Sequence, residues 1–331
     1  MNSYWQGKKI LVTGAGGFIG SHLVERLVED GASVRAFVRY NSRADIGLLR
    51  MASPEIISKL DLIGGDLRDP DAIRKAVKDC EYVFHLGALI SIPYSYLHPV
   101  EVAESNLIGT LNILMACRDF GIQRLIHTST SEVYGTAKTP MIDETHPLQG
   151  QSPYSASKIG ADKLAESFYS AYELPVVTVR PFNTYGPRQS ARAVIPTIIT
   201  QALAMKTIYL GNTSTIRDFT YVDDTVNGFL CTAMTKDVEG GVFNLGTGAS
   251  VSIGELAEKI IQKVGNSVKV EVDTSRLRPQ KSEVMRLLSD NSLARERLDW
   301  KPNVNLDDGL ERTIAWIREN LGHYRVGTYE R

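Results

Sequence analysis

The sequence has little of what marks several classes of protein. Its 331 residues contain three cysteines, Cys80, Cys117 and Cys231, which lie far apart and form no CxxC pair. We therefore expect no disulfide framework and no metal cluster, and a reducing cytoplasm fits this cysteine usage best. No apolar run approaches the ~18 residues that cross a bilayer, and the apolar stretch near the N-terminus is interrupted by glycines with no cleavage site behind it. The sequence thus predicts a cytoplasmic protein without a membrane segment.

Neither sign of charge is in excess. The chain carries 37 Lys and Arg against 38 Asp and Glu, a formal net charge of -1. A near-neutral chain has no general attraction to nucleic acid or to an anionic membrane, so any phosphate must be bound by a few placed residues. Hydrophobic residues make up 43% and charged residues 23%, which is typical of a folded globular protein.

Buried strands alternate with helices through the first half of the chain. The expected strands are 9–13, 33–38, 60–63, 82–86, 124–128 and 175–180, and the expected helices are 17–29, 69–78, 99–120 and 153–172. This alternation predicts an α/β fold with a Rossmann-like, doubly wound parallel sheet. Beyond Arg180 the pattern changes, but 223–234 is typical of a helix and 241–245 of a strand that returns to the first sheet.

The predicted division into domains is discontinuous. Residues 1–180 and about 219–247 are expected to form a nucleotide-binding Rossmann domain. Residues from about 181 to 218 and from 248 to 331 are expected to form a smaller α/β substrate domain. Ligands of such folds bind in the crevice at the carboxyl ends of the strands, so we expect the site in the cleft between the two domains.

A glycine-rich turn follows the first expected strand. Gly14, Gly17 and Gly20 form GxxGxxG between a strand and a helix. Glycines at such a turn let the backbone approach a pyrophosphate, and the helix N-terminus attracts its charge. The turn therefore predicts a dinucleotide site, the alternative being a simple tight turn.

With Thr13 in front, the motif becomes TGxxGxxG, which resembles the short-chain dehydrogenase/reductase superfamily. The resemblance implies cofactor contacts in this turn and at the ends of the third and fourth strands. These contacts would be made by Gly14, Gly17, Phe18, Ile19, Asp66, Leu67, Leu86 and Ala88. His85, just before this last pair, is expected to be a hydrogen-bonded histidine at a strand end rather than a catalytic residue.

The end of the second strand indicates which dinucleotide binds. An acid there usually binds the ribose hydroxyls, whereas an arginine accommodates a 2′-phosphate. Arg39 stands at this place, Ser42 and Arg43 follow, and no Asp or Glu lies between Gly31 and Asp45. We therefore predict NADP as the cofactor, with NAD as the alternative if the arginines form only a solvated basic edge.

Chemistry in this superfamily needs a tyrosine and a lysine one helical turn apart, where the ammonium lowers the pKa of the phenol. Three Tyr-x-x-x-Lys pairs occur: Tyr4–Lys8, Tyr134–Lys138 and Tyr154–Lys158. The first lies before the first strand, and the second is followed by Gly135, which disfavours a helix. The third follows Ser152 and Pro153, a helix cap and a first-turn proline. We predict Tyr154 and Lys158 as the catalytic pair.

The segment HTSTSEVYG follows the strand 124–128. The resemblance places Thr130 as the hydroxyl that binds the reacting oxygen, with Ser131 and Glu132 next to it in the catalytic set. Nucleotide-sugar 4,6-dehydratases carry Thr-x-Glu here, and the GDP-mannose type carries Thr-Ser-Glu, whereas 4-epimerases usually lack the acid. Glu132 is thus implied as the base that removes the C5 proton and then protonates the leaving C6 hydroxyl. UDP-glucuronate decarboxylases share TSEVYG, and a surface acid at a strand end is the further alternative.

The resemblance covers essentially the whole chain, which looks like an extended short-chain dehydrogenase/reductase. It implies that Asn183, Arg217 and Arg278 face a nucleotide-sugar diphosphate, which an arginine fork can hold with two hydrogen bonds. Arg278-Pro279 continues as Gln-Lys-Ser where the family usually has Gly-Asp. The stretches TSTSEVYGTA, PYSASKIGAD and RPFNTYGPRQSARAVIPT look most like dehydratases of the legionaminic-acid type, which act on nucleotide-linked N-acetylglucosamine.

The function implied is a nucleotide-sugar 4,6-dehydratase, a lyase that acts on a UDP- or GDP-linked N-acetylglucosamine or related hexose. The alternatives are a UDP-glucuronate decarboxylase, a 4-epimerase, an enzyme that stops at the 5,6-alkene, and a non-catalytic NADP-sensing regulator. Such a regulator would be expected to lack Thr130, Tyr154 or Lys158, and this chain keeps all three. The family usually forms homodimers through two long helices, here 99–120 and 154–172, so we expect a homodimer.

Overall fold

The computed structural model describes residues 3–328, so the outer ends of the predicted domain ranges, residues 1–2 and 329–331, lie outside it. Its centre is a seven-stranded sheet in the order β11-β6-β5-β4-β1-β2-β3, with every neighbouring pair parallel. The strands are β1 (Lys9–Thr13), β2 (Ser33–Arg39), β3 (Asp61–Gly65), β4 (Tyr82–His85), β5 (Arg124–Thr128), β6 (Val176–Pro181) and β11 (Val242–Leu245). The doubly wound parallel sheet predicted from the alternating pattern is confirmed.

The strand order reverses beside β1, which pairs with β2 on one side and β4 on the other. This reversal opens a crevice at the carboxyl ends of the strands, where folds of this kind bind their ligands. The late strand also behaves as predicted, because β11 pairs with β6 and sets Val242 opposite Thr178. A segment that follows β6 by some sixty positions therefore completes the edge of the first sheet.

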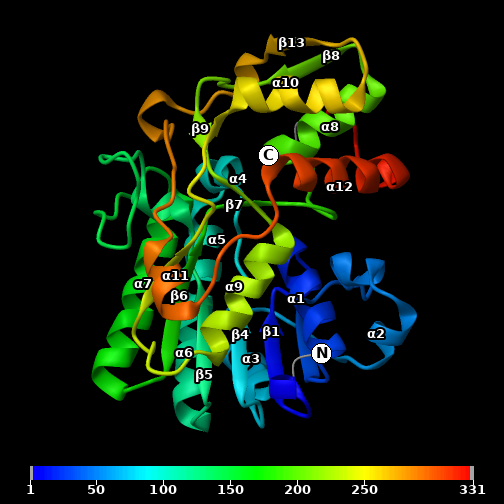
Figure 1. The fold of residues 1–331 in the computed structure, drawn as a ribbon. Coiled ribbons are helices and arrows are strands. Elements are labelled where there is room, and N and C mark those ends of the chain that lie inside the picture. The colour runs from blue at the N-terminus through cyan, green and yellow to red at the C-terminus, as the bar shows by residue number, and fades with distance from the viewer. Residues whose placement is uncertain (1–2, 329–331) are drawn as a thin grey trace.

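Helices cover both faces of the sheet (Figure 1). Alternate residues of β1 show the division, since Ile10 and Val12 pack in one apolar cluster and Leu11 in the other. The first cluster takes in α1 (Phe18–Glu29) and α9 (Val222–Met234), and the second takes in α3 (Pro70–Val77), α6 (Gly109–Phe120) and α7 (Pro153–Tyr172). Short helices α2 (Pro54–Ser58), α4 (Ile92–Leu97) and α11 (Ser292–Leu298) lie in the connections.

The helix predicted over 99–120 is interrupted. Its first part is α5 (Pro99–Ala103), and a π-helical turn over Glu104–Ile108 precedes α6. Asn106 lies in this turn, donates to the Ser157 hydroxyl of α7 at 3.0 Å and exchanges two hydrogen bonds with the backbone of Leu89. A π turn widens the helix by one residue, and here it turns a polar side chain inward. The apolar period alone does not reveal such an insertion.

The part of the chain after β6 builds a second layer, at the top of Figure 1. Helices α8 (Val194–Ala204), α10 (Ile253–Val264) and α12 (Leu306–Glu319) pack together beside the pair β8 (Thr207–Leu210) and β13 (Lys269–Val272). Two further pairs connect this layer to the sheet: β7 (Asn183–Tyr185) with β10 (Phe219–Tyr221), and β9 (Ile216–Arg217) with β12 (Val251–Ser252). Among residues 3–328, the helices include none long and apolar enough to cross a membrane.

Candidate active site

The predicted catalytic tyrosine stands at the start of α7. Ser152 caps this helix, because its hydroxyl accepts from the backbone N–H of Ser155 at 3.1 Å while the Ser155 hydroxyl accepts from the Ser152 N–H at 3.0 Å. Pro153 occupies the first helical position, as the sequence predicted. The cap fixes where the helix begins and so places Tyr154 in its first turn, with only 6% of the residue exposed.

Thr130 follows β5 by two residues, and its side chain interacts with the Tyr154 phenol. Burial raises the pKa of the Tyr154 phenol, the Thr130 hydrogen bond acts to lower it, and the carboxylates of Glu132 and Asp162 raise it further. Loss of water therefore dominates the pKa of this phenol. That the Lys158 ammonium lowers the phenol pKa stays a prediction.

Lys158 follows on the same face of α7 and is 3% exposed. Burial lowers the pKa of its ammonium to about 8, and the Asp162 carboxylate, one turn further along α7, acts to raise it. A buried ammonium at this pKa carries its charge at neutral pH and loses it in mild alkali.

Glu132 lies on a short 3₁₀ helix over Ser131–Tyr134 that Thr130 caps. The Thr130 hydroxyl accepts from the Glu132 N–H at 3.2 Å, and Ser131 is buried beside it. The Glu132 carboxylate faces Arg278, with Oε1 3.7 Å from Nη1. Residues far apart in the sequence thus meet, and a positive charge lies beside the predicted base.

A second carboxylate, that of Glu283, lies near Arg278. Glu283 lies 3.8 Å from Arg217 and 4.0 Å from Arg278. Arg217 is buried, and burial together with the Arg278 charge lowers the pKa of its guanidinium while Glu132 and Glu283 act to raise it. Arg278 Nη1 is shielded from solvent and makes no hydrogen bond within residues 3–328.

Sequence reasoning missed Glu283. The sequence after Arg278-Pro279 departs from the Gly-Asp that is usual in the family, which indicates an altered loop. This departure does not show which side chain of the loop reaches the site. Asn183, predicted to face the same ligand, donates from Nδ2 to the backbone carbonyl of Asp218 at 3.1 Å. Its strand β7 pairs with β10, which begins two residues after Arg217.

The glycine turn has the geometry that close approach of a diphosphate requires. Gly14 has a φ of +68°, and a Cβ there would lie 2.8 Å from the backbone nitrogen of Gly87. A Cβ on Gly20 would lie 2.2 Å from the Gly14 carbonyl oxygen. The helix α1 begins at Phe18, and its cap residue Gly17 supplies no side-chain hydrogen bond, so the first-turn N–H groups have no side chain over them. These features fit the pyrophosphate of a dinucleotide.

Asp66 and Arg39, two of the predicted cofactor contacts, each form an ion pair with another residue of the chain. Arg68 donates to both oxygens of the Asp66 carboxylate, at 3.0 and 2.7 Å, and this bidentate bond lowers the carboxyl pKa. Arg39 is 63% exposed and pairs with Glu101 of α5 at 3.2 Å. The loop after β2 offers no acid before Asp45, and the acid that pairs with Arg39 comes from α5.

The remaining cofactor-site predictions lie along the same edge. Leu86 donates its N–H to the Thr13 carbonyl at 3.2 Å, the side chain of Leu67 lies against Gly87, and Ile19, Ser42 and Ala88 lie on the adjoining segments. His85 is bonded to the hydroxyls of Thr13 at 2.7 Å and Thr110 at 3.1 Å, and burial holds its pKa well below the usual range. It is a neutral structural histidine, as expected.

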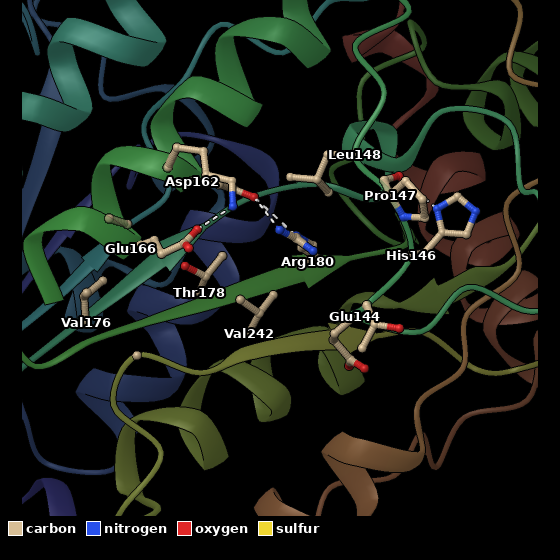
Figure 2. A pocket seen from close by; sticks show the side chains of 14 residues that line it. Glu144, His146, Pro147, Leu148, Asp162, Glu166, Val176, Thr178, Arg180 and Val242 are labelled. Carbon is tan, nitrogen blue, oxygen red and sulfur yellow. Dashed lines mark hydrogen bonds and ion pairs between the residues drawn. The ribbon is translucent and has the colours of Figure 1, made fainter. Parts of the chain in front are cut away.

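A cavity of about 440 Å³ lies elsewhere, at the edge of the sheet beside α7 (Figure 2). Its walls are α7, β6, β11 and the segment 144–148, and they include Glu144, His146, Asp162, Glu166, Arg180 and Val242. None of the predicted catalytic, cofactor or substrate residues lines it, so it is not the predicted cleft. In the described part of the chain, no group of three or more His, Cys, Asp or Glu residues is placed to hold a metal ion.

Comparison with known proteins agrees with this geometry. The family model described as GDP-mannose 4,6 dehydratase matches residues 11–313. The chain belongs to this family of NAD-dependent epimerases and dehydratases. The family membership predicted from TGxxGxxG and the Tyr154–Lys158 pair is confirmed.

The similar proteins include both 4-epimerases and 4,6-dehydratases. A UDP-glucose 4-epimerase of Mycolicibacterium smegmatis is 34% identical over 317 residues, covering 94% of this chain and 98% of that protein. A dTDP-glucose 4,6-dehydratase of Actinoplanes sp. is 33% identical over 319 residues, covering 94% and 98%. The solved structure of DesIV, a dTDP-glucose 4,6-dehydratase from Streptomyces venezuelae with NAD and TYD bound, has a TM-score of 0.84 at 30% identity and covers 96% of this chain and 99% of that one. Overall similarity does not separate the two reactions, so the choice depends on the site residues.

Proposed function

We propose that this family member is a nucleotide-sugar 4,6-dehydratase that converts a UDP- or GDP-linked N-acetylglucosamine, or a related hexose, to its 4-keto-6-deoxy product. The observation that carries the proposal is the position of Glu132. This acid is two residues from Thr130, whose hydroxyl accepts from the Glu132 N–H at 3.2 Å and whose side chain interacts with the Tyr154 phenol. An epimerase needs the hydroxyl and the tyrosine but has no use for an additional base beside them.

The mechanism follows from what each residue can exchange with the sugar. A nicotinamide cofactor held at the turn of Gly14, Gly17 and Gly20 would supply the hydride acceptor for C4 and the hydride donor for C6. Tyr154 as phenolate takes the proton of the C4 hydroxyl, and Thr130 holds that oxygen by a hydrogen bond. The 4-ketone so formed acidifies the C5–H bond, because the resulting carbanion is delocalised as an enolate.

Glu132 then removes the C5 proton and delivers it to the C6 hydroxyl, which leaves as water. The proton still held by Tyr154 balances the later protonation of C5, so no net proton is consumed. Proton transfer by a positioned side chain contributes roughly 10²–10⁴-fold to the rate. Arg217, Arg278 and Asn183 bind the diphosphate and hold the sugar over these groups.

The reaction is tested by mass. Incubation with NADP and a panel of UDP- and GDP-sugars should give a product lighter by one water that carries a ketone. Release of carbon dioxide would identify a decarboxylase. An unchanged mass with an altered sugar would identify a 4-epimerase. Loss of water without formation of a ketone would identify an enzyme that stops at the 5,6-alkene. Cofactor binding with no turnover of any sugar would favour the regulator.

Glu132→Gln tests the base directly. The variant should lose dehydration by about 10²-fold or more while it still binds cofactor, since proton removal at C5 depends on the carboxylate. Glu55→Gln, at an acid whose side chain is 78% exposed on α2, is the matched control. Ketosugar formation by Glu132→Gln at a near-normal rate would contradict the assignment.

For the cofactor we propose NADP in preference to NAD. Support comes from Arg39 at the end of β2, whose guanidinium is largely exposed and can exchange Glu101 for a 2′-phosphate. Arg39→Asp should reverse the preference by at least about tenfold in the ratio of the two dissociation constants. Equal affinities of the unmodified protein for NAD and NADP, measured by fluorescence titration, would contradict this proposal.

A homodimer, a cytoplasmic location and the discontinuous domain division complete the proposal. Support for the dimer is an apolar surface on the helices that the family pairs. Side chains exposed there include Val100, Ile108, Met115, Phe120, Tyr169 and Tyr172. Light scattering at micromolar concentration should give twice the chain mass of 36.6 kDa, and Met115→Lys should halve it.

A further inference from the structure

Two acidic side chains from the segment before α6 pair with arginines near the predicted ribose end of the cofactor site. Glu101 of α5 lies 3.2 Å from Arg39, and Glu104 of the π turn lies 3.4 Å from Arg68. Arg68 is also held by both carboxylate oxygens of Asp66, which directly follows β3. Three acids thus pair with two arginines, so these five side chains offer no surplus of positive charge to a ligand phosphate.

The Glu101 carboxylate has a separate partner on each oxygen. Oε1 accepts from Arg39 Nη2 at 3.2 Å, and Oε2 accepts from the Tyr94 hydroxyl at 2.5 Å. Tyr94 is itself held in place, because its N–H donates to the Ser91 cap of α4 at 3.3 Å and its ring packs on His98 with the centroids 4.4 Å apart. The hydrogen bonds from Tyr94 and Arg39 hold the pKa of this carboxyl below its usual value, so Glu101 is an anion at neutral pH.

The two ends of this ion pair are held differently. The Arg39 side chain is 63% exposed at the end of β2, whereas that of Glu101 is 28% exposed and is anchored by Tyr94. A 2′-phosphate that binds Arg39 has to draw the guanidinium away from a fixed negative charge. The competition lowers the affinity for a 2′-phosphate and leaves the affinity for an uncharged 2′-hydroxyl nearly unchanged.

We propose that Glu101 is a specificity-determining residue of the cofactor site: it competes with the 2′-phosphate of NADP for Arg39 and so sets how strongly the site prefers NADP to NAD. The inference rests on the proposed function only in that Arg39 is the contact of the 2′-phosphate. It does not depend on the sugar or on the reaction at C4.

Two adenosine nucleotides that differ only in the 2′-phosphate measure this competition. Calorimetric titration of the full chain with adenosine 2′,5′-bisphosphate and with adenosine 5′-monophosphate gives both dissociation constants without turnover. Glu101→Gln should bind the bisphosphate about tenfold more tightly and the monophosphate within about twofold of the unmodified protein, because only the phosphate competes with the carboxylate. No gain for the bisphosphate, or an equal gain for both nucleotides, would overturn the proposal.

Glu104→Gln is the matched control. It makes the same change in net charge three residues along the chain, at a side chain that is 51% exposed. Its affinity for the bisphosphate should change by less than about twofold, since an exposed charge away from Arg39 is screened by solvent. A gain as large as that of Glu101→Gln would show that net charge alone matters, and would overturn the proposal.

A double variant shows whether Glu101 acts through Arg39. In a protein that already carries Arg39→Gln, the further change Glu101→Gln should alter the affinity for the bisphosphate by less than about twofold, because neither the ion pair nor the phosphate contact remains. A tenfold gain in that background would mean that Glu101 acts without Arg39, and the competition would be rejected.

The two nucleotides also separate this inference from the proposed cofactor. If the unmodified protein binds the monophosphate more tightly and Glu101→Gln gains affinity for the bisphosphate, NADP is rejected as the cofactor and Glu101 is retained as the determinant. If the unmodified protein prefers the bisphosphate and Glu101→Gln brings no gain, NADP is retained and the role of Glu101 is rejected.

Discussion

Two regions of the site are built in different ways. Along α7 and just beyond β5, direct hydrogen bonds hold Asp162, which accepts from the Ser129 hydroxyl at 2.8 Å, and Thr130, which accepts from the Glu132 N–H at 3.2 Å. Between Glu132, Glu283 and the arginines the charges lie 3.7 to 4.0 Å apart, and no direct hydrogen bond joins them. The first region is already assembled, whereas the second has donors to spare for a ligand.

The largest expected effect is in the assembled region. Tyr154→Phe removes the group that takes the C4 proton and should lower kcat by about 10²–10⁴-fold with little change in KM. Tyr172→Phe, at an exposed ring on the same helix, is the control. If KM rose in Tyr154→Phe while kcat held, the tyrosine would be a binding group and the contrast between the two regions would disappear.

A substitution in the region of Arg217 and Arg278 should change KM more than kcat. Arg278→Lys keeps the charge but loses the fork, so KM for the nucleotide sugar should rise by about tenfold, with a smaller change in kcat. Arg50→Lys, at a half-exposed arginine away from the site, should change neither parameter. An unchanged KM in Arg278→Lys would mean that the diphosphate binds elsewhere.

The smallest expected effect concerns how α7 is placed. Ser152→Ala removes the cap and should lower the free energy of unfolding by about 1 kcal/mol. The apolar contacts of α7 are untouched, so kcat at low temperature should stay close to normal. Urea unfolding followed by circular dichroism measures the loss, and a large drop in kcat without lost stability would show that the cap acts on catalysis itself.

The sheet and the start of the helix that carries Tyr154 could be predicted because their signals are local. Strands such as β1 and β5 are short apolar runs, and Ser152-Pro153 distinguishes the pair at Tyr154 from its two rivals. The contacts of Glu283 with Arg217 and Arg278, and of Glu101 with Arg39, were not predicted. Each joins residues from distant elements, and the spacing of residues in the sequence does not show such contacts. The effect of burial on the Tyr154 pKa could not be predicted, because helical spacing says nothing about how much water the fold removes.

The π turn at Glu104–Ile108 has a consequence for insertions and deletions. One residue of an α-helix corresponds to about 100° of rotation, so the extra residue here sets the direction in which the side chains of α6 point relative to those of α5. Deletion of one residue would restore a regular helix and rotate the side chains of α6 relative to those of α5. Either Asn106 would turn away from Ser157, or Ile113 and Leu114 would leave the core. This stretch should therefore accept substitutions at its exposed positions and no change in length.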